Sequence, residues 1–89
     1  MNIKITNASM THDSEEGYKG HVSFEVEGHK HPYEVTLLTK KGKMWDYSLS
    51  FGKESGSEEE IFAVEKALEE DDELFDLIVE AAEDSLEQA

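Results

Sequence analysis

Apolar and polar residues alternate with a period of two through much of the first 51 positions. In the stretch 19–27, Val22, Phe24 and Val26 fall on one side of an extended chain and the polar residues on the other. Side chains of a strand point alternately to its two faces, so this pattern predicts an antiparallel sheet with one wet face. The same alternation predicts four strands, at about 2–7, 19–27, 31–40 and 43–51.

The connections predict the order of these strands. A short polar link at 28–30 and a glycine-containing turn at 40–43 are typical of hairpins, so the strands should form a meander. The polar stretch 9–18 is expected to be a longer loop, from which Met10 turns back toward the core.

Helical spacing replaces the alternation after residue 56. Ser57 followed by Glu60 matches a capping box, in which the serine oxygen accepts from an amide of the first turn. Apolar residues then recur at helical intervals and predict helices at about 57–70 and 72–87. A single long helix is the alternative, because no glycine or proline interrupts the segment. Two helices are favoured, with Asp71 or Asp72 as the second N-cap, since a continuous helix would place both aspartates on its apolar stripe.

The sheet and the helices together predict an α+β fold with one domain at 1–89. The aromatic side chains of 43–51 share one sheet face, and a one-sided sheet must be covered. The C-terminal helices are the cover that this chain offers, so they should pack on that face. Trp45, Tyr47 and Phe51 are therefore expected in the core.

The net negative charge comes entirely from the C-terminal part of the chain. Residues 1–53 contain seven acids and seven lysines, whereas residues 54–89 contain 15 acids and one lysine and carry the whole net charge of −14. The chain has no arginine, the residue that grips phosphate with a planar fork. Direct binding to nucleic acid or to an anionic membrane is therefore disfavoured. Without cysteine or an apolar leader at its start, the chain is expected to be cytoplasmic.

The acidic helical face is the strongest candidate for a binding surface. Several of its acids stand four residues apart, as in Asp76/Glu80 and Glu80/Asp84, and such pairs destabilise a helix. Helix stability therefore does not explain them, and a basic protein partner would. The alternatives are a solvated face that maintains solubility and, in the extreme, a nucleic-acid mimic. The candidate partner-binding residues are Glu69, Asp72, Glu73, Asp76, Glu80, Glu83, Asp84 and Glu87.

Metal binding has weaker support. His21, His29 and His31 lie on or between neighbouring predicted strands and could offer imidazoles to Zn²⁺ or Ni²⁺, but their spacing matches no ligand pattern. The acidic run 71–73 lacks the glycine and the alternating ligands of a calcium loop. No metal or other cofactor is expected, and these three histidines remain weak candidates.

The sequence predicts a protein that is not an enzyme. No nucleophile elbow, phosphate-binding loop or dinucleotide fingerprint is present. The best hypothesis is a small interaction or regulatory module that binds a basic protein through its acidic helices. A self-associating structural domain is the alternative, because Leu77 and Val79 lie off the main apolar stripe and could form a dimer seam. A monomer or a weak homodimer is expected.

Overall fold

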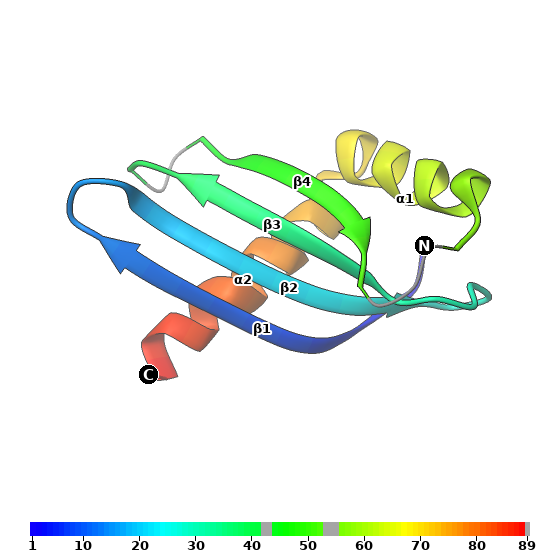
Figure 1. The fold of residues 1–89 in the computed structure, drawn as a ribbon, viewed down its shortest axis with the longest axis horizontal. Coiled ribbons are helices and arrows are strands. Elements are labelled where there is room, and N and C mark those ends of the chain that lie inside the picture. The colour runs from blue at the N-terminus through cyan, green and yellow to red at the C-terminus, as the bar shows by residue number, and fades with distance from the viewer. Residues whose placement is uncertain (42–43, 53–55, 89) are drawn as a thin grey trace.

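The computed structural model describes residues 1–41, 44–52 and 56–88. Four strands are followed by two helices, and the sheet is antiparallel in the order β1-β2-β3-β4 (Figure 1). The elements are β1 Ile3–Asp13, β2 Gly17–Val26, β3 Tyr33–Thr39, β4 Asp46–Phe51, α1 Glu58–Glu70 and α2 Asp72–Gln88. The α+β prediction is confirmed. The predicted turn residues 42–43 lie outside the described residues.

The first strand is longer than predicted, and the loop predicted at 9–18 is wrong. Pairing with β2 continues to Asp13, opposite Gly17. The register shifts between Ile5 and Asn7, which inserts a bulge and changes which residues face inward. Ile3 and Ile5 face the core before the bulge, and Met10 faces it afterwards and is buried. Because of this shift, the apolar residues of β1 do not follow a single period of two, and the sequence pattern does not show where the strand ends.

A tight turn joins β1 to β2. The Asp13 carboxylate accepts hydrogen bonds from the amides of Glu15 and Glu16, at 2.7 and 3.2 Å. These two bonds hold the pKa of Asp13 below its usual value. Gly17 follows with φ of 94°, a left-handed conformation that favours glycine. The chain therefore reverses direction within this turn and continues directly into β2.

Two helices form, as predicted, and Asp71 separates them. Ser57 Oγ accepts from the amide of Glu60 at 3.3 Å and caps α1. The Asp71 amide donates to the Ala67 carbonyl at 2.8 Å, and the Asp71 carboxylate accepts from the amides of Glu73 and Leu74. One residue thus ends α1 and begins α2. Asp71 stays exposed, which a continuous helix with this stripe facing the core would not allow.

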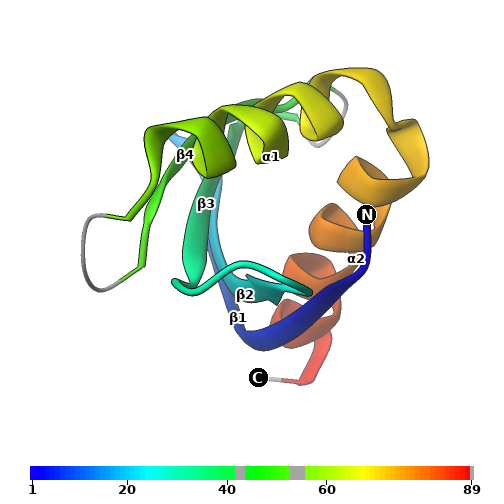
Figure 2. The ribbon, with the colours of Figure 1, turned by 90° about the vertical axis from the view of Figure 1, so that its right-hand side faces the viewer.

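Helix α2 lies across one face of the sheet, and α1 runs from the β4 edge toward that same side (Figure 2). Helix α2 packs against β1 and β2, whereas α1 lies beside β4. Ala82 of α2 comes so close to Gly20 of β2 that an added Cβ at position 20 would stand 3.3 Å from the Ala82 methyl group. The core between the layers consists of Met10, Val22, Phe24, Val26, Tyr33, Val35, Leu37, Val64, Leu68, Leu74, Ile78, Val79 and Ala82.

The aromatic residues of β4 are covered less than predicted. Trp45, Tyr47, Leu49 and Phe51 pack against the core but stay half-buried. Helix α2 packs against β1 and β2, so α1 is left to cover the β4 edge. The prediction that these rings lie in the core is therefore only partly right, and the edge near β4 keeps exposed apolar surface.

Candidate functional site

We call the acidic residues predicted to bind a partner the acidic helical surface. Every member whose side chain is described is exposed: Glu69, Asp72, Glu73, Asp76, Glu80, Glu83 and Asp84. The side chain of Glu87 lies outside the described part of the chain. The ion pair found among the described residues joins His21 and Glu34 in the sheet, so none of these seven acids pairs with a lysine in the described part of the chain.

Helix α2 separates its charges from its core by the helical period. Leu74, Ile78 and Ala82 are buried at intervals of four. The acids occupy the remaining sides of the helix and point to solvent. Asp76 and Glu80 therefore lie on adjacent turns of the same helix, as the sequence predicts. Glu69 and Glu73 do not form such a pair, because the break at Asp71 places them in different helices.

The repulsion along α2 can be measured. Glu80 is exposed and stands four residues from both Asp76 and Asp84. Replacing Glu80 by glutamine removes two like-charge pairs and should raise the free energy of unfolding by roughly 0.4–1 kcal/mol. Urea denaturation at low ionic strength measures this gain, which should shrink in high salt. A loss of stability would mean that Glu80 has an attractive partner within the chain.

Apolar surface accompanies the acids near β4. Phe62 on α1 is 62% exposed. The Tyr47 ring of β4 lies 5.4 Å from the Phe75 ring of α2. Burial, and then the carboxylates of Glu69 and Glu65, raise the pKa of Tyr47. These carboxylates of α1 therefore act on the same edge of the sheet as the half-buried β4 rings.

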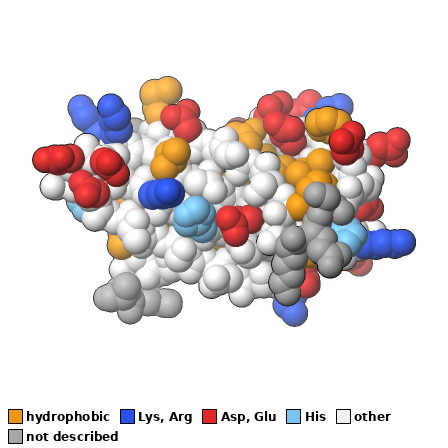
Figure 3. Space-filling model, in the orientation of Figure 1, with side chains coloured by type: hydrophobic (Ala, Val, Ile, Leu, Met, Phe, Trp, Pro, Cys, Tyr) orange, Lys and Arg blue, Asp and Glu red, His pale blue; other side chains and the backbone are white. Residues whose placement is uncertain are grey.

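Acidic and apolar side chains meet around α1. In Figure 3 red and orange side chains gather where α1 and the end of β4 lie, while the open face of the sheet is mostly white. Sequence reasoning did not single out Phe62. The sequence feature that predicts an exposed Phe62 is its position, one residue past Ile61 and off the apolar stripe formed by Ile61, Val64 and Leu68.

The three candidate histidines do not converge. His21 lies in the middle of β2, and its Nδ1 faces Thr36 Oγ1 at 3.3 Å and Glu34 Oε1 at 3.6 Å. His29 lies in the link after β2, where its Nδ1 is 2.9 Å from the buried Tyr33 hydroxyl. His31 follows two residues later. Across 1–41, 44–52 and 56–88, no group of three or more potential ligands is placed to hold a metal ion.

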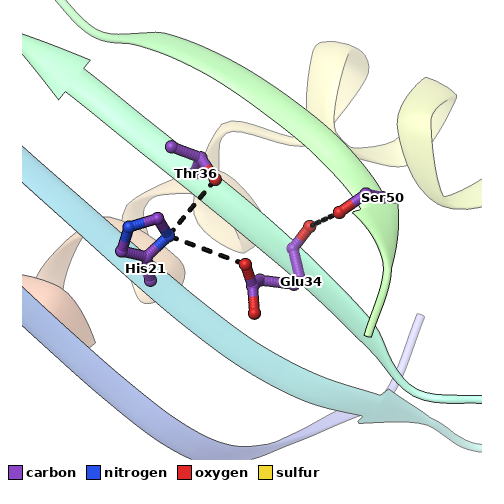
Figure 4. A network of polar contacts seen from close by, with 4 residues as sticks. All are labelled: His21, Glu34, Thr36 and Ser50. Atoms are coloured by element: carbon purple, nitrogen blue, oxygen red, sulfur yellow. Dashed lines mark hydrogen bonds and ion pairs between the residues drawn. The ribbon is translucent and has the colours of Figure 1, made fainter. Parts of the chain in front are cut away.

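The polar cluster on the open sheet face is not arranged for nucleophilic catalysis. Figure 4 shows His21, Glu34 and Thr36 together, with Ser50 Oγ donating to the Glu34 carbonyl at 3.5 Å. A catalytic imidazole needs one ring nitrogen toward an orienting acid and the other toward a nucleophile. Here the same atom, Nδ1 of His21, faces both the acid and the hydroxyl. The polar contacts of this cluster link β2 to β3 and β3 to β4.

Two open hollows lie at opposite ends of the sheet. One, of about 800 Å³, is lined near the β3–β4 connection by Lys40 and Lys41 together with Glu16 and Asp46, around apolar groups that include Trp45. The other, of about 430 Å³, lies beside the β2–β3 link. The described charges of the larger hollow balance, so they select neither an anionic nor a cationic ligand.

The residues proposed for a dimer seam separate in the structure. Val79 is buried in the core, whereas Leu77 is 47% exposed. The apolar excess of α2 that suggested self-association is therefore reduced to Leu77. Within the described part of the chain, neither helix is apolar enough over a sufficient length to cross a membrane.

Comparisons with known proteins provide no relative from which a role could be transferred. No protein-family model matches the chain, and neither the curated proteins nor the solved structures give a significant match.

Proposed function

We propose that this protein is a small, non-enzymatic interaction module of the cytoplasm that binds a basic protein partner through its acidic helical surface. The observation that carries the proposal is that its seven described acids are all exposed and none is paired with a lysine within residues 1–41, 44–52 and 56–88. Neighbouring carboxylates at positions such as Asp76 and Glu80 cost helix stability, and a cationic partner would relieve that cost.

Electrostatic steering supplies the mechanism. A net charge of −14 concentrated in the last 36 residues produces a one-sided field that attracts a basic partner and speeds its encounter. Such binding must weaken as salt rises, because the Debye length falls from about 10 Å at 0.1 M to about 3 Å at 1 M. The partner gains both orientation and rate from this field.

A pair of charge-matched variants tests the proposal. The first replaces Asp76, Glu80 and Asp84 by their amides. The control neutralises Glu15, Glu16 and Glu25, which are also exposed but lie in the sheet and its first turn. Both variants change the net charge equally. In affinity capture from the native host, the helical variant should lose basic partners at least tenfold relative to the control, on the order of 1.4 kcal/mol of binding free energy.

A salt series completes this experiment. The partners captured by the unaltered protein should dissociate progressively between about 0.1 and 1 M salt. Recovery of only neutral or acidic proteins, held equally well at high salt, would exclude the acidic helical surface as the binding site. Equal losses in the two variants would show that total charge matters and its position does not.

A further inference from the structure

The hydrogen-bond pattern of β4 shows which of its backbone groups point outward. The Gly52 amide donates to the Pro32 carbonyl at 3.0 Å, and these residues continue the antiparallel register of β3 and β4. In an antiparallel pair, hydrogen-bonded and non-bonded positions alternate. Ser50 and Ser48 therefore bond to β3, while the amide and carbonyl groups of Tyr47 and Leu49 point away from the sheet.

These outward groups have no partner among the described residues. Strand β4 is the last in the sheet order, and neither Tyr47 nor Leu49 takes part in a recorded backbone hydrogen bond outside the strand pairing. Helix α1 begins beside β4 and runs toward the side of the sheet that carries α2 (Figure 2). Each residue thus offers one donor and one acceptor to a further strand.

The two edges of the sheet differ in how they are protected. The other edge strand, β1, carries a bulge between Ile5 and Asn7 and the charged Lys4, and both features discourage pairing. The range Asp46–Phe51 contains no proline, glycine or lysine, and its register with β3 is unbroken. An edge this regular is suited to pairing with another strand.

The side chains along β4 indicate the chemistry of that strand. Tyr47 and Leu49 are half-buried, so an incoming strand gains apolar contact with these two side chains. Glu65 and Glu69 of α1 act on the Tyr47 hydroxyl, so negative charge stands beside this apolar strip. Apolar side chains on one face of a strand, within a basic segment, complement both features.

We propose that β4 binds the basic partner by β-strand addition: an extended segment with alternating apolar and basic side chains bonds to the free backbone groups of Tyr47 and Leu49. This inference rests on the proposed function and specifies how the partner binds. The acidic helical surface attracts the segment, and the β4 edge holds it.

A second copy of this chain fits the edge less well. Two β4 strands paired across a two-fold axis would place both α1 helices on the same side of one continuous sheet. Each α1 carries six glutamates against one lysine, with Glu65 and Glu69 next to the edge. Like charges brought together across an interface oppose association. A cationic strand meets no such repulsion.

Two peptides test strand addition directly. The first is a short capped peptide of alternating lysine and valine. The second has the same sequence with its alternate backbone amides N-methylated on the edge that would face β4, so it keeps the charge and side chains but cannot complete the ladder. The methylated peptide should bind roughly tenfold more weakly or worse. In the free protein the amides of Tyr47 and Leu49 should exchange rapidly with solvent, and the first peptide should protect both.

A variant pair applies the same test to the protein. Leu49→Pro removes the outward amide without removing a bond to β3, which is where an edge strand tolerates proline. Leu49→Ala loses the same packing but keeps the amide. Both variants lose the Leu49 side-chain contact, so the proline variant should bind the unmodified peptide roughly tenfold more weakly than the alanine variant. Should the proline variant fail to fold, the peptide comparison decides alone.

Each remaining outcome has a defined meaning. Equal binding of both peptides, without protection of Tyr47 and Leu49, would overturn strand addition and leave the acidic surface as a charge-driven site. Binding of neither peptide at low salt would also overturn it, and the charge-matched capture experiment would then judge the proposed function separately. Protection of both amides that rises with protein concentration alone would assign the edge to a second copy.

Discussion

Replacing Gly17 by alanine should lower the free energy of unfolding by about 3 kcal/mol, a large fraction of the stability of a domain this small. Gly17 has φ of 94°, where a side chain adds strain. An added Cβ would also stand 2.6 Å from the Cα of Lys40 and closer still to the Thr39 carbonyl oxygen. Both obstacles are backbone atoms, so the β1–β2 turn or the end of β3 must move. Chemical denaturation measures the loss.

Gly28 provides the matched control. Its φ of 88° is nearly the same, but an added Cβ would meet nothing within 4 Å. Gly28→Ala should therefore cost about 1 kcal/mol, the conformational strain alone. Equal losses at the two positions would show that the contact with β3 is relieved without cost and that the close approach at Gly17 does not constrain the fold.

Truncating Ile78 to alanine should lower the free energy of unfolding by about 2–5 kcal/mol. Ile78 is completely buried at the centre of the layer between α2 and the sheet. Its removal leaves a cavity that the close Gly20–Ala82 contact prevents the helix from filling by moving inward. The variant should unfold at a lower urea concentration, and calorimetry should show a lower melting temperature.

The neighbouring residue provides the comparison for Ile78. Leu77 is 47% exposed, and Leu77→Ala should change stability by no more than about 0.5 kcal/mol. A loss of several kcal/mol at Leu77 that depended on protein concentration would reveal a homodimer in which this side chain is buried. Similar effects at both positions without such dependence would contradict the packing of α2 described above.

The regular parts of this fold could be predicted because one period governs each of them. Strands β2, β3 and β4 keep the alternation of apolar and polar residues. Ser57 and Asp71 are the N-cap residues that mark where the two helices begin. Strand β1 could not be bounded, because the bulge after Ile5 changes its phase partway along. A one-residue insertion looks the same in a sequence as the end of a strand.

The acidic surface was predictable and the β4 edge was not. Exposure of the charged residues follows from the cost of burying them, so their place on the outside of α1 and α2 required only the helical period. Which strand lies at the edge, which of its amides point outward and whether α1 reaches over it depend on the packing of elements distant in sequence.

The shared residue between the helices determines how rigidly the acidic surface is presented. Because Asp71 terminates one helix and caps the next, no further linker residue separates α1 from α2. Tilting α1 relative to α2 requires breaking the bond from Asp71 to Ala67 or those from Glu73 and Leu74 to Asp71. These bonds therefore favour one orientation of the two acidic helices before any encounter. In the proposed complex, the entropy lost on binding would fall on the partner, with this chain as the preorganised template.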